Sequence, residues 1–587
     1  MCGFSKKRDF IMKTTSETRN QTLKIHSISE LNREGEGTDS HRGLEEYSSL
    51  ELNYREYREH TGAELGGMKN PYYPRIKRMK NGKYIMTYQA NRISWEVFYA
   101  LSDDGINWSN ARKLLGVCDY PDGYADTMVF MTADLCVLDD GTIIVVSAFR
   151  GKANYSKDVN SNGLMIVKSK DNGATWSDKE KIYTGTCWEP YIMQTSSGEV
   201  QVYFTQTGHL LAKYGWKNDR RSSCVGLLRS RDRGQSWTKQ EGYSAQIVMQ
   251  QFVFNRDGYD YMCDQMPVAT ELHNGTIALA AETCNAQNSY RLSVAYSKDN
   301  WAKNLAYDEA GPEDRVTNFV QAAGPYIAQF ESGETVLSCH RYEMNMYIGT
   351  ADATSFTNHY QPFGRHKGNW SCVFVDSAHS VIGAMANEDG KTVNGVEVPS
   401  FLDVGRMYLN HAIYAKHSQI SVDARTDDWE DNTAALFIGS ESQAQMSMRF
   451  AYDDEKLYLL IERLDHCMTD ADAEEIYLPA QNGAYYIVRF GINGIDSVLY
   501  CKGEAVAEAE LESVECATEV VRTADGDIGK ILEAAIPRSQ ISIGEDGMLA
   551  FNAVLYNKDG NGQLLTDTFS NVEVTDVNTW QRVFLTK

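Results

Sequence analysis

Short apolar runs, each introduced by a turn glycine, recur along the first two thirds of the chain. Many of them alternate between apolar and polar residues, and few segments show a helical period. The runs are NGKYIMTYQ (81–89), DGTIIVVSAF (140–149), SGEVQVYFT (197–205), NGTIALAAE (274–282), SGETVLSCH (332–340) and, less regularly, GNWSCVFVD (368–376). Another short apolar segment precedes each run. Paired runs of this length, joined by Gly or Asp turns, predict successive β-hairpins.

A second repeat runs in phase with the first. SKDNGATW places Ser169, Asp171, Gly173 and Trp176 at fixed offsets, and SRDRGQSW repeats them from Ser230. LSDDGINW fits with Leu101 in the serine place, followed by Asp103, Gly105 and Trp108, and SKDNW and TADATSF are degenerate copies. Asp and Ser bond the backbone of such turns, and the Trp packs on adjoining strands. The motif is therefore predicted to be structural, and Asp171 and Asp232 are not expected to be catalysts.

The period of these repeats predicts the architecture. The aspartates at 103, 171, 232 and 299 lie 68, 61 and 67 residues apart, a spacing typical of repeated supersecondary units. Four-stranded antiparallel sheets repeated around an axis form a β-propeller. We therefore expect an all-β chain with a polar lead-in at 1–64, part of which could dock as a final strand, and a six-bladed propeller at 65–417. The Ser-x-Asp turn pattern stops after an expected closing strand at 405–415, and 418–587 is predicted to be a β-sandwich.

The composition of the chain excludes several classes of partner and site. The formal net charge of −23 disfavours nucleic acid and anionic membranes as partners. The 12 cysteines form no CxxC pair, and no run of 18 apolar residues could span a membrane. The N-terminus lacks the apolar stretch of a signal peptide, so the chain as written is expected in the cytoplasm, or secreted if the true start lies elsewhere. No calcium site is predicted, because Asp139-Asp140-Gly141 and Asp453-Asp454 resemble turns without EF-hand spacing. No other metal or cofactor is predicted, because no HExxH, P-loop or GxGxxG motif stands in a credible context.

Two glutamates and an arginine stand outside the turn motifs. Glu189 lies between Trp188 and Pro190, Glu282 ends an apolar strand, and Arg75 lies on a predicted innermost strand. Two carboxylates across one pocket suit glycoside cleavage, in which one is nucleophile or base and the other protonates the leaving oxygen. The alternatives are an ordinary loop glutamate, a strand-end glutamate facing solvent, and a structural ion pair at Arg75.

The Ser-x-Asp-x-Gly-x-x-Trp repeats resemble the Asp boxes of sialidase-like six-bladed propellers. YPRI, WEP followed by GEVQVYF, MPV and the later strand-end Glu are most similar to glycoside hydrolase family 93, the exo-acting α-1,5-L-arabinanases. That resemblance implies a retaining exo-glycosidase without cofactors, with Glu189 as nucleophile and Glu282 as acid/base, or the reverse. It also implies a site tyrosine, for which Tyr342 and Tyr347 are candidates. Cys263, Asp264 and Gln265 replace the family's usual Arg-Asp-Gly, which could remove a substrate contact.

Other readings stay open. An exo-α-sialidase would need three arginines around a carboxylate, which Arg75 could form with two of Arg150, Arg291 and Arg341; a non-catalytic glycan-binding protein is the second alternative. Residues 418–587 resemble carbohydrate-binding modules of family 9, with Trp429 expected in the core and Trp580 as a possible platform for a sugar ring. An oligosaccharide or polysaccharide is the expected partner. The predicted substrate contacts are Arg75, Trp188, Asp126, Arg150, Arg341, Tyr342, Tyr347 and Trp580.

Overall fold

The computed structural model describes residues 48–585 with interruptions. Its described residues fall into two compact units, one of Ser49–Leu409 and one that includes Asn410–Lys587. In this part of the chain, no helix is long and apolar enough to cross a membrane, and the cysteines are free. The interruptions are 92–94, 156–157, 208–222, 239–244, 257–258, 285–288, 303–314, 318–319, 331–332, 365, 378–379, 388–391, 394–395, 398–399, 411, 430–434, 440–443, 466, 510, 524–525, 569–573, 576 and 578–579.

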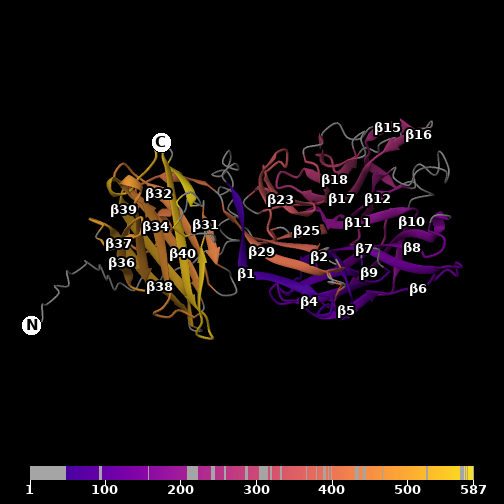
Figure 1. The fold of residues 1–587 in the computed structure, drawn as a ribbon, viewed down its shortest axis with the longest axis horizontal. Coiled ribbons are helices and arrows are strands. Elements are labelled where there is room, and N and C mark those ends of the chain that lie inside the picture. The colour runs from indigo at the N-terminus through magenta and orange to yellow at the C-terminus, as the bar shows by residue number, and fades with distance from the viewer. Residues whose placement is uncertain are drawn as a thin grey trace, which may run out of the picture. The chain divides into compact units, whose positions relative to one another are not determined.

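The first unit is a six-bladed β-propeller, which confirms the predicted fold class (Figure 1). Its first three sheets are β2 (Pro71–Arg78), β3 (Tyr84–Ala90), β4 (Val97–Ser102) and β5 (Ser109–Leu115); β6 (Cys118–Asp119), β7 (Thr127–Val137), β8 (Ile143–Gly151), β9 (Asn162–Ser169) and β10 (Glu180–Thr184); and β11 (Cys187–Gln194), β12 (Val200–Gln206), β13 (Cys224–Ser230) and β14 (Gln246–Met249). A 3₁₀ turn, η3 (Val159–Ser161), precedes β9.

The other three sheets complete the ring. They are β17 (Asp264–Glu271), β18 (Ile277–Cys284), β19 (Tyr290–Ser297) and β20 (Arg315–Thr317); β21 (Ala323–Gln329), β22 (Thr335–Arg341), β23 (Glu343–Gly349) and β24 (Phe356–Tyr360); and β25 (Gly368–Ser377), β26 (Ser380–Asn387), β29 (Phe401–Asn410) and β1 (Ser49–Thr61). Two short hairpins are β15 (Phe252–Arg256) with β16 (Tyr259–Met262), and β27 (Thr392–Val393) with β28 (Val396–Glu397).

The first strands of the blades form the inner ring. Contacts join β2 to β7, β7 to β11, β11 to β17, β17 to β21, β21 to β25, and β25 back to β2. Each of these strands carries a bulge with one residue at positive φ: Tyr73, Thr132, Glu189, Met266, Gly324 and Trp370, with φ of 58°, 50°, 45°, 49°, 60° and 53°. Positive φ is strained for a residue with a side chain. Its recurrence in all six blades makes the bulge part of the fold.

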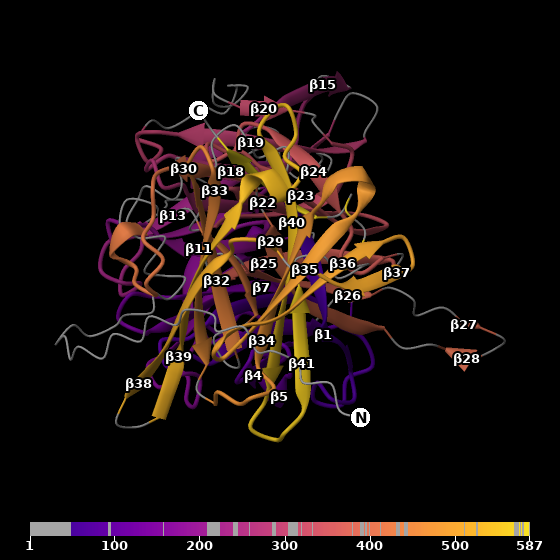
Figure 2. The ribbon, with the colours of Figure 1, turned by 90° about the vertical axis from the view of Figure 1, so that its left-hand side faces the viewer.

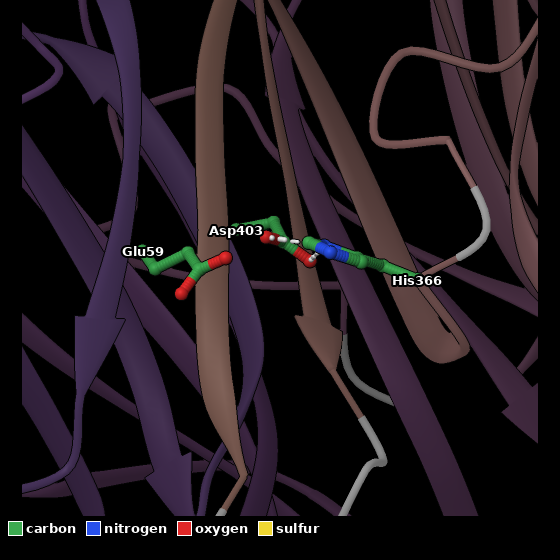
Figure 3. A group of neighbouring side chains, drawn as sticks. All are labelled: Glu59, His366 and Asp403. Carbon is green, nitrogen blue, oxygen red and sulfur yellow. Dashed lines mark hydrogen bonds and ion pairs between the residues drawn. The ribbon is translucent and has the colours of Figure 1, made fainter.

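The predicted lead-in supplies the outermost strand of the sixth blade, because β1 pairs with β29 (Figure 1). The Tyr57 hydroxyl donates to fully buried Asp403 at 2.7 Å, and His366 Nδ1 lies 3.2 Å from the same carboxylate. Figure 3 shows Glu59 beside this pair. These contacts tie a strand from the start of the unit to one from its end.

The turn motifs are built as predicted in four of the five copies. In the copy at 169–176, the Ser169 hydroxyl donates to Asp171 at 2.8 Å and accepts from the Gly173 N–H at 2.9 Å. The hydroxyl of Tyr99, a neighbouring-blade residue that packs edge-on against Trp176, donates to the Gly173 carbonyl. Hydrogen bonds from the hydroxyl and the N–H of Thr175, with that from Ser169, lower the pKa of Asp171 to about 2. The motif therefore fixes the turns between outer strands.

The predicted register of the first copy is wrong by one residue. Ser102, not Leu101, donates to Asp104 at 2.9 Å, and the Asp104 carboxylate accepts from the N–H groups of Ile106 and Asn107. Asp103 instead forms an exposed ion pair with Lys83. The Asp-Asp dipeptide offered two registers, and the shorter spacing to Gly105 and Trp108 is the one that folds.

We expect Asp104→Ala to lower the free energy of unfolding by about 1–2 kcal/mol, the usual cost of losing a capping carboxylate. Asp103→Ala is the matched control and should leave stability unchanged. Burial raises the pKa of Asp104, but its hydrogen bonds outweigh this and leave the pKa below the ordinary value. The stabilisation is thus present above that ordinary value and is lost as pH falls through the lowered pKa. Denaturant melts at pH 7 test this; equal losses in both variants would contradict the register.

The second unit is one large sheet that curls over on itself (Figure 2). Apolar side chains from its two halves pack together between them, as in a sandwich. Phe450 and Phe551, from strands in its two halves, lie 4.6 Å apart between ring centroids. In sheet order its strands are β37 (Ala505–Glu508), β36 (Gly494–Lys502), β35 (Tyr485–Gly491), β34 (Ala473–Pro479), β40 (Met548–Lys558), β42 (Gln581–Leu585), β30 (Ile413–His417), β32 (Ala444–Tyr452), β33 (Lys456–Asp465), β39 (Gly526–Pro537) and β38 (Glu515–Thr523), with β31 (Leu436–Gly439) on β32 and β41 (Leu564–Thr568) on β40. Three 3₁₀ turns are η4 (Asp427–Trp429), η5 (Gln481–Gly483) and η6 (Arg538–Gln540).

Trp580 is not a sugar platform, contrary to our prediction. Its side chain is 1 % exposed, its indole N–H donates to the Val574 carbonyl at 2.8 Å, and Tyr477 and Tyr485 pack edge-on against it. Trp429 is fully buried, as expected. The two tryptophans of residues 418–587 are therefore both core residues, and neither offers a face to a ligand.

We expect Trp580→Phe to destabilise the second unit by about 2 kcal/mol, because a smaller ring leaves a void and the Val574 carbonyl loses its donor. Binding of soluble glycans should be unchanged at a temperature where the variant is folded. Thermal denaturation paired with isothermal titration tests both parts. If stability were unchanged and glycan binding were lost, Trp580 would bind a sugar ring after all.

Candidate functional site

Glu189 lies at the inner ring because it is the bulge residue of β11. Its backbone N–H donates to the Thr132 hydroxyl of the preceding blade at 3.2 Å. Its Oε2 accepts from the Thr205 hydroxyl at 2.8 Å, and the side chain is half-buried. The bulge that strains Glu189 thus also brings its carboxylate to the Thr205 hydroxyl of β12.

Glu282 lies near the end of β18 in the next blade and is 4 % exposed. Its Oε1 accepts from the Gly324 N–H at 2.5 Å, and its Oε2 accepts from Gln265 Nε2 at 2.8 Å. The strand-end glutamate is therefore not directed into solvent. Gln265, which stands where the family 93 pattern has Gly, is a direct partner of this carboxylate.

A short path of contacts joins the two carboxylates. The Thr205 hydroxyl that donates to Glu189 accepts from the Met266 N–H at 2.8 Å, and Met266 follows Gln265, the donor to Glu282. Burial raises the pKa of Glu282 to about 7, and burial together with the charge of Glu282 raises that of Glu189 to about 7. Near neutral pH such a pair can hold one proton, which leaves one group an acid and the other a base.

Arg75 is a structural residue, contrary to its prediction as a substrate contact. It is 3 % exposed, and its Nε lies 3.5 Å from Oδ2 of Asp134, which is 1 % exposed. Its Nη1 donates to the Pro74 carbonyl at 2.7 Å and the Trp370 carbonyl at 3.2 Å, while the guanidinium lies over the Tyr73 ring. The open alternative of a structural ion pair is the arrangement found, and Asp134 already opposes the charge of this arginine.

Trp188 and Arg150 lie together beside Glu189. The Arg150 guanidinium carbon is 3.8 Å from the centre of the Trp188 ring and 4.3 Å from that of Tyr155. The Arg150 charge favours the ionised form of Glu189. Asp126 holds a loop. Its carboxylate accepts hydrogen bonds from the N–H groups of Thr127, Ala153 and Asn154. The carboxylate that was predicted to contact substrate is therefore already engaged by the backbone.

Arg341, Tyr342 and Tyr347 line one pocket of about 350 Å³ on the fifth blade. Tyr342 is 71 % exposed at a φ of 80°, and Tyr347 stacks on His359 at 4.9 Å. Ala322, also in the lining, lies two residues before Gly324, whose N–H holds Glu282. A pocket lined by polar and aromatic groups in this way suits a sugar unit.

One group among the described residues has ligand atoms close enough for a metal ion. Atoms of Glu59, His366 and Asp403 lie within 4.8 Å of one another. Figure 3 shows them where β1 meets the rest of the sixth blade. The Tyr57 hydroxyl and His366 already engage the Asp403 carboxylate, so these contacts account for the cluster as part of blade closure.

Sequence reasoning missed Thr205, and a signal for it was present. Thr205 lies seven residues after the turn glycine Gly198, as Glu282 lies seven after Gly275 and His340 seven after Gly333. These side chains therefore occupy equivalent places in successive blades. Comparing that position across the repeats would have placed Thr205 beside the glutamates.

Comparisons with known proteins can now be set beside this geometry. A sialidase of Clostridium perfringens is 29 % identical over 119 residues, 19 % of this chain, and the match spans only 30 % of that relative's length. The family 93 α-L-arabinofuranosidase of Fusarium graminearum, solved with arabinobiose, is 14 % identical, covers 60 % of this chain and 98 % of its own, and has a TM-score of 0.42. A family 9 carbohydrate-binding module of Caldicellulosiruptor kristjanssonii, solved with glucose, is 16 % identical, covers 30 % of this chain and 95 % of its own, and has a TM-score of 0.23. Residues 70–305 match the model of the BNR repeat-like domain, and they lie within the six-bladed propeller of the first unit.

Proposed function

We propose that the chain is an exo-acting glycoside hydrolase in which Glu189 and Glu282 cleave a neutral, arabinan-type oligosaccharide. The observation that carries the proposal is the pair of glutamates from adjacent blades, linked through Thr205, Met266 and Gln265, whose burial raises the pKa of both to about 7. Inverting and retaining glycosidases both need one protonated and one ionised carboxyl at neutral pH.

The contacts of each oxygen support an assignment of roles. The Thr205 hydroxyl engages Glu189 Oε2 and the side chain is half-buried, so we assign Oε1 as the oxygen that approaches the anomeric carbon. Glu282 is more deeply buried, and burial is what holds its proton near neutral pH. In the proposed reaction, Glu189 attacks as the glycosidic bond breaks and Glu282 protonates the leaving oxygen. Glu282 then activates the water that releases the sugar from Glu189.

The pocket on the fifth blade supports binding of a sugar unit next to the scissile bond. Exposed Tyr342 offers a ring face, and Arg341, Gln321 and Gln361 offer donors to hydroxyl groups. The neutral character of the proposed substrate follows from Arg75, because its charge is already opposed by Asp134. Exo-α-sialidase remains the second candidate, and the similarity to the Clostridium perfringens sialidase favours it.

A substrate screen tests the proposal. The protein is incubated with aryl glycosides, arabino-oligosaccharides and sialosides, and the first-formed anomer is followed by NMR. We expect release of arabinose-type units from the chain end with retention. Release of sialic acid alone would establish the second candidate, and binding without turnover of any glycoside would favour a non-catalytic glycan-binding protein.

A further inference from the structure

The second strand of each blade carries one residue opposite the position that precedes the bulge. In chain order these residues are Gln89, Ala148, Thr205, Glu282, His340 and Ala386. Because the bulge recurs in every blade, the six side chains occupy equivalent places around the ring. Glu282 is one of them, so its neighbours in the series show what this position does.

Where the side chain is polar, it accepts the N–H of the next blade's bulge residue. Gln89 Oε1 accepts from Thr132 at 2.8 Å, Thr205 from Met266 at 2.8 Å, Glu282 from Gly324 at 2.5 Å and His340 Nδ1 lies 3.3 Å from the Trp370 nitrogen. The common role is to fasten one blade to the next. Thr205 differs from the others, because it also donates to the bulge residue of its own blade, Glu189.

The hydroxyl of Thr205 donates its hydrogen bond to Glu189. The Met266 N–H occupies a lone pair of Oγ1 and makes this oxygen an acceptor there. Thr205 is 2 % exposed, and Glu189 Oε2 at 2.8 Å is its acceptor among the described residues. If Glu189 were protonated at Oε2 and donated to Thr205, the hydroxyl hydrogen would be buried without a partner, which is costly.

We propose that Thr205 is a positioning residue that orients Glu189, keeps its Oε2 as a hydrogen-bond acceptor and leaves Oε1 free to act as the nucleophilic oxygen. This inference rests on the proposed hydrolase function and deepens it. Thr205 touches neither the glycosidic bond nor the leaving group, and acts only through Glu189. The same hydroxyl couples the nucleophile to the fourth blade, since Met266 follows the Gln265 that bonds Glu282.

The test compares Thr205→Val, Thr205→Ser and Thr205→Cys with wild type on the best substrate of the screen. Removing a hydrogen bond to a charged group should lower kcat for Thr205→Val by about 10- to 100-fold, with KM within about twofold. Because the bond favours ionised Glu189, its loss should move the acidic limb of the pH profile of kcat/KM upward by about one pH unit. Serine should restore both, and cysteine, a weak donor of similar shape, should lie between.

Thr87→Val is the matched control. Thr87 Oγ1 is equally buried and has no hydrogen-bond partner, so its removal should leave both kinetics and pH profile unchanged. Wild-type kcat and profile in Thr205→Val would overturn the inference while leaving the proposed function intact. A drop in kcat without a pH shift in both Val and Cys variants would also overturn it, since that is the signature of a merely structural threonine. A wild-type protein inactive on every glycoside would overturn the proposed function and this inference with it.

Discussion

Glu189→Gln and Glu282→Gln are each expected to lower kcat by about 10³–10⁵-fold while the affinity for the intact oligosaccharide stays within a fewfold of wild type. Glutamine keeps the shape of each side chain. At position 282 its carbonyl can still accept from the Gly324 N–H, and the Gln265 amide can rotate to present its oxygen. The blades should therefore stay fastened, and the variants lose the ionisable group alone.

The control is Glu271→Gln. Glu271 lies on β17, in the same blade as Glu282, and its carboxylate accepts from Ser196 at the far end of that strand. It should retain full turnover. Circular dichroism and melting temperature verify folding of all three variants, and titration with an uncleaved oligosaccharide measures binding. A Glu189→Gln or Glu282→Gln protein with wild-type turnover removes that residue from the chemistry.

The roles of the two glutamates can be separated with alanine variants and azide. On an aryl glycoside with a good leaving group, azide can replace the missing carboxylate. In Glu189→Ala, azide would attack the anomeric carbon directly and give a glycosyl azide of inverted configuration. In Glu282→Ala, the Glu189 intermediate still forms, so the azide product would keep the substrate's configuration. The opposite outcome would exchange the two assignments.

The repeat pattern predicted most of the fold because each blade restates the same local chemistry. Turn glycines, apolar runs and Ser-x-Asp turns are short-range signals, and five copies reinforce one another. The less regular run at 368–376 is instead the first strand of the sixth blade, β25. The predicted register at Asp103 and Asp104 was wrong because two adjacent aspartates made the local signal ambiguous. The predicted exposure of Trp580 was wrong for another reason: its burial depends on Tyr477 and Tyr485, which are distant in the chain.

The candidate site was only partly readable from the sequence. Glu189 and Glu282 stood out as charged residues in apolar surroundings, and the structure brings them together. The bulges did not stand out, because only Gly324 among the six positive-φ residues is glycine. Arg75 was predicted to contact substrate because its structural partners cannot be identified from the sequence. Asp134 lies in the next blade, and the Trp370 carbonyl lies 295 residues away.

Arg75→Met is expected to lower the free energy of unfolding of the propeller by about 3–5 kcal/mol, the usual cost of leaving one member of a buried ion pair alone. Arg75 joins three blades, because it lies on β2, faces Asp134 of β7 and donates to Trp370 of β25. Burial raises the pKa of Asp134, and the charges of Lys77 and Arg75 oppose this rise. Without Arg75, Asp134 must take up a proton or stay charged with Lys77 as the remaining nearby cation.

The double variant Arg75→Met/Asp134→Leu separates this electrostatic cost from lost packing. Removing both charges should recover at least half of the stability lost in Arg75→Met, because an apolar pair of similar volume leaves no uncompensated buried charge. Denaturant unfolding of wild type, both single variants and the double variant gives the coupling energy. If Arg75→Met instead kept wild-type stability and raised KM, the arginine would contact substrate after all, and the argument for a neutral sugar would fall with the structural role from which it derives.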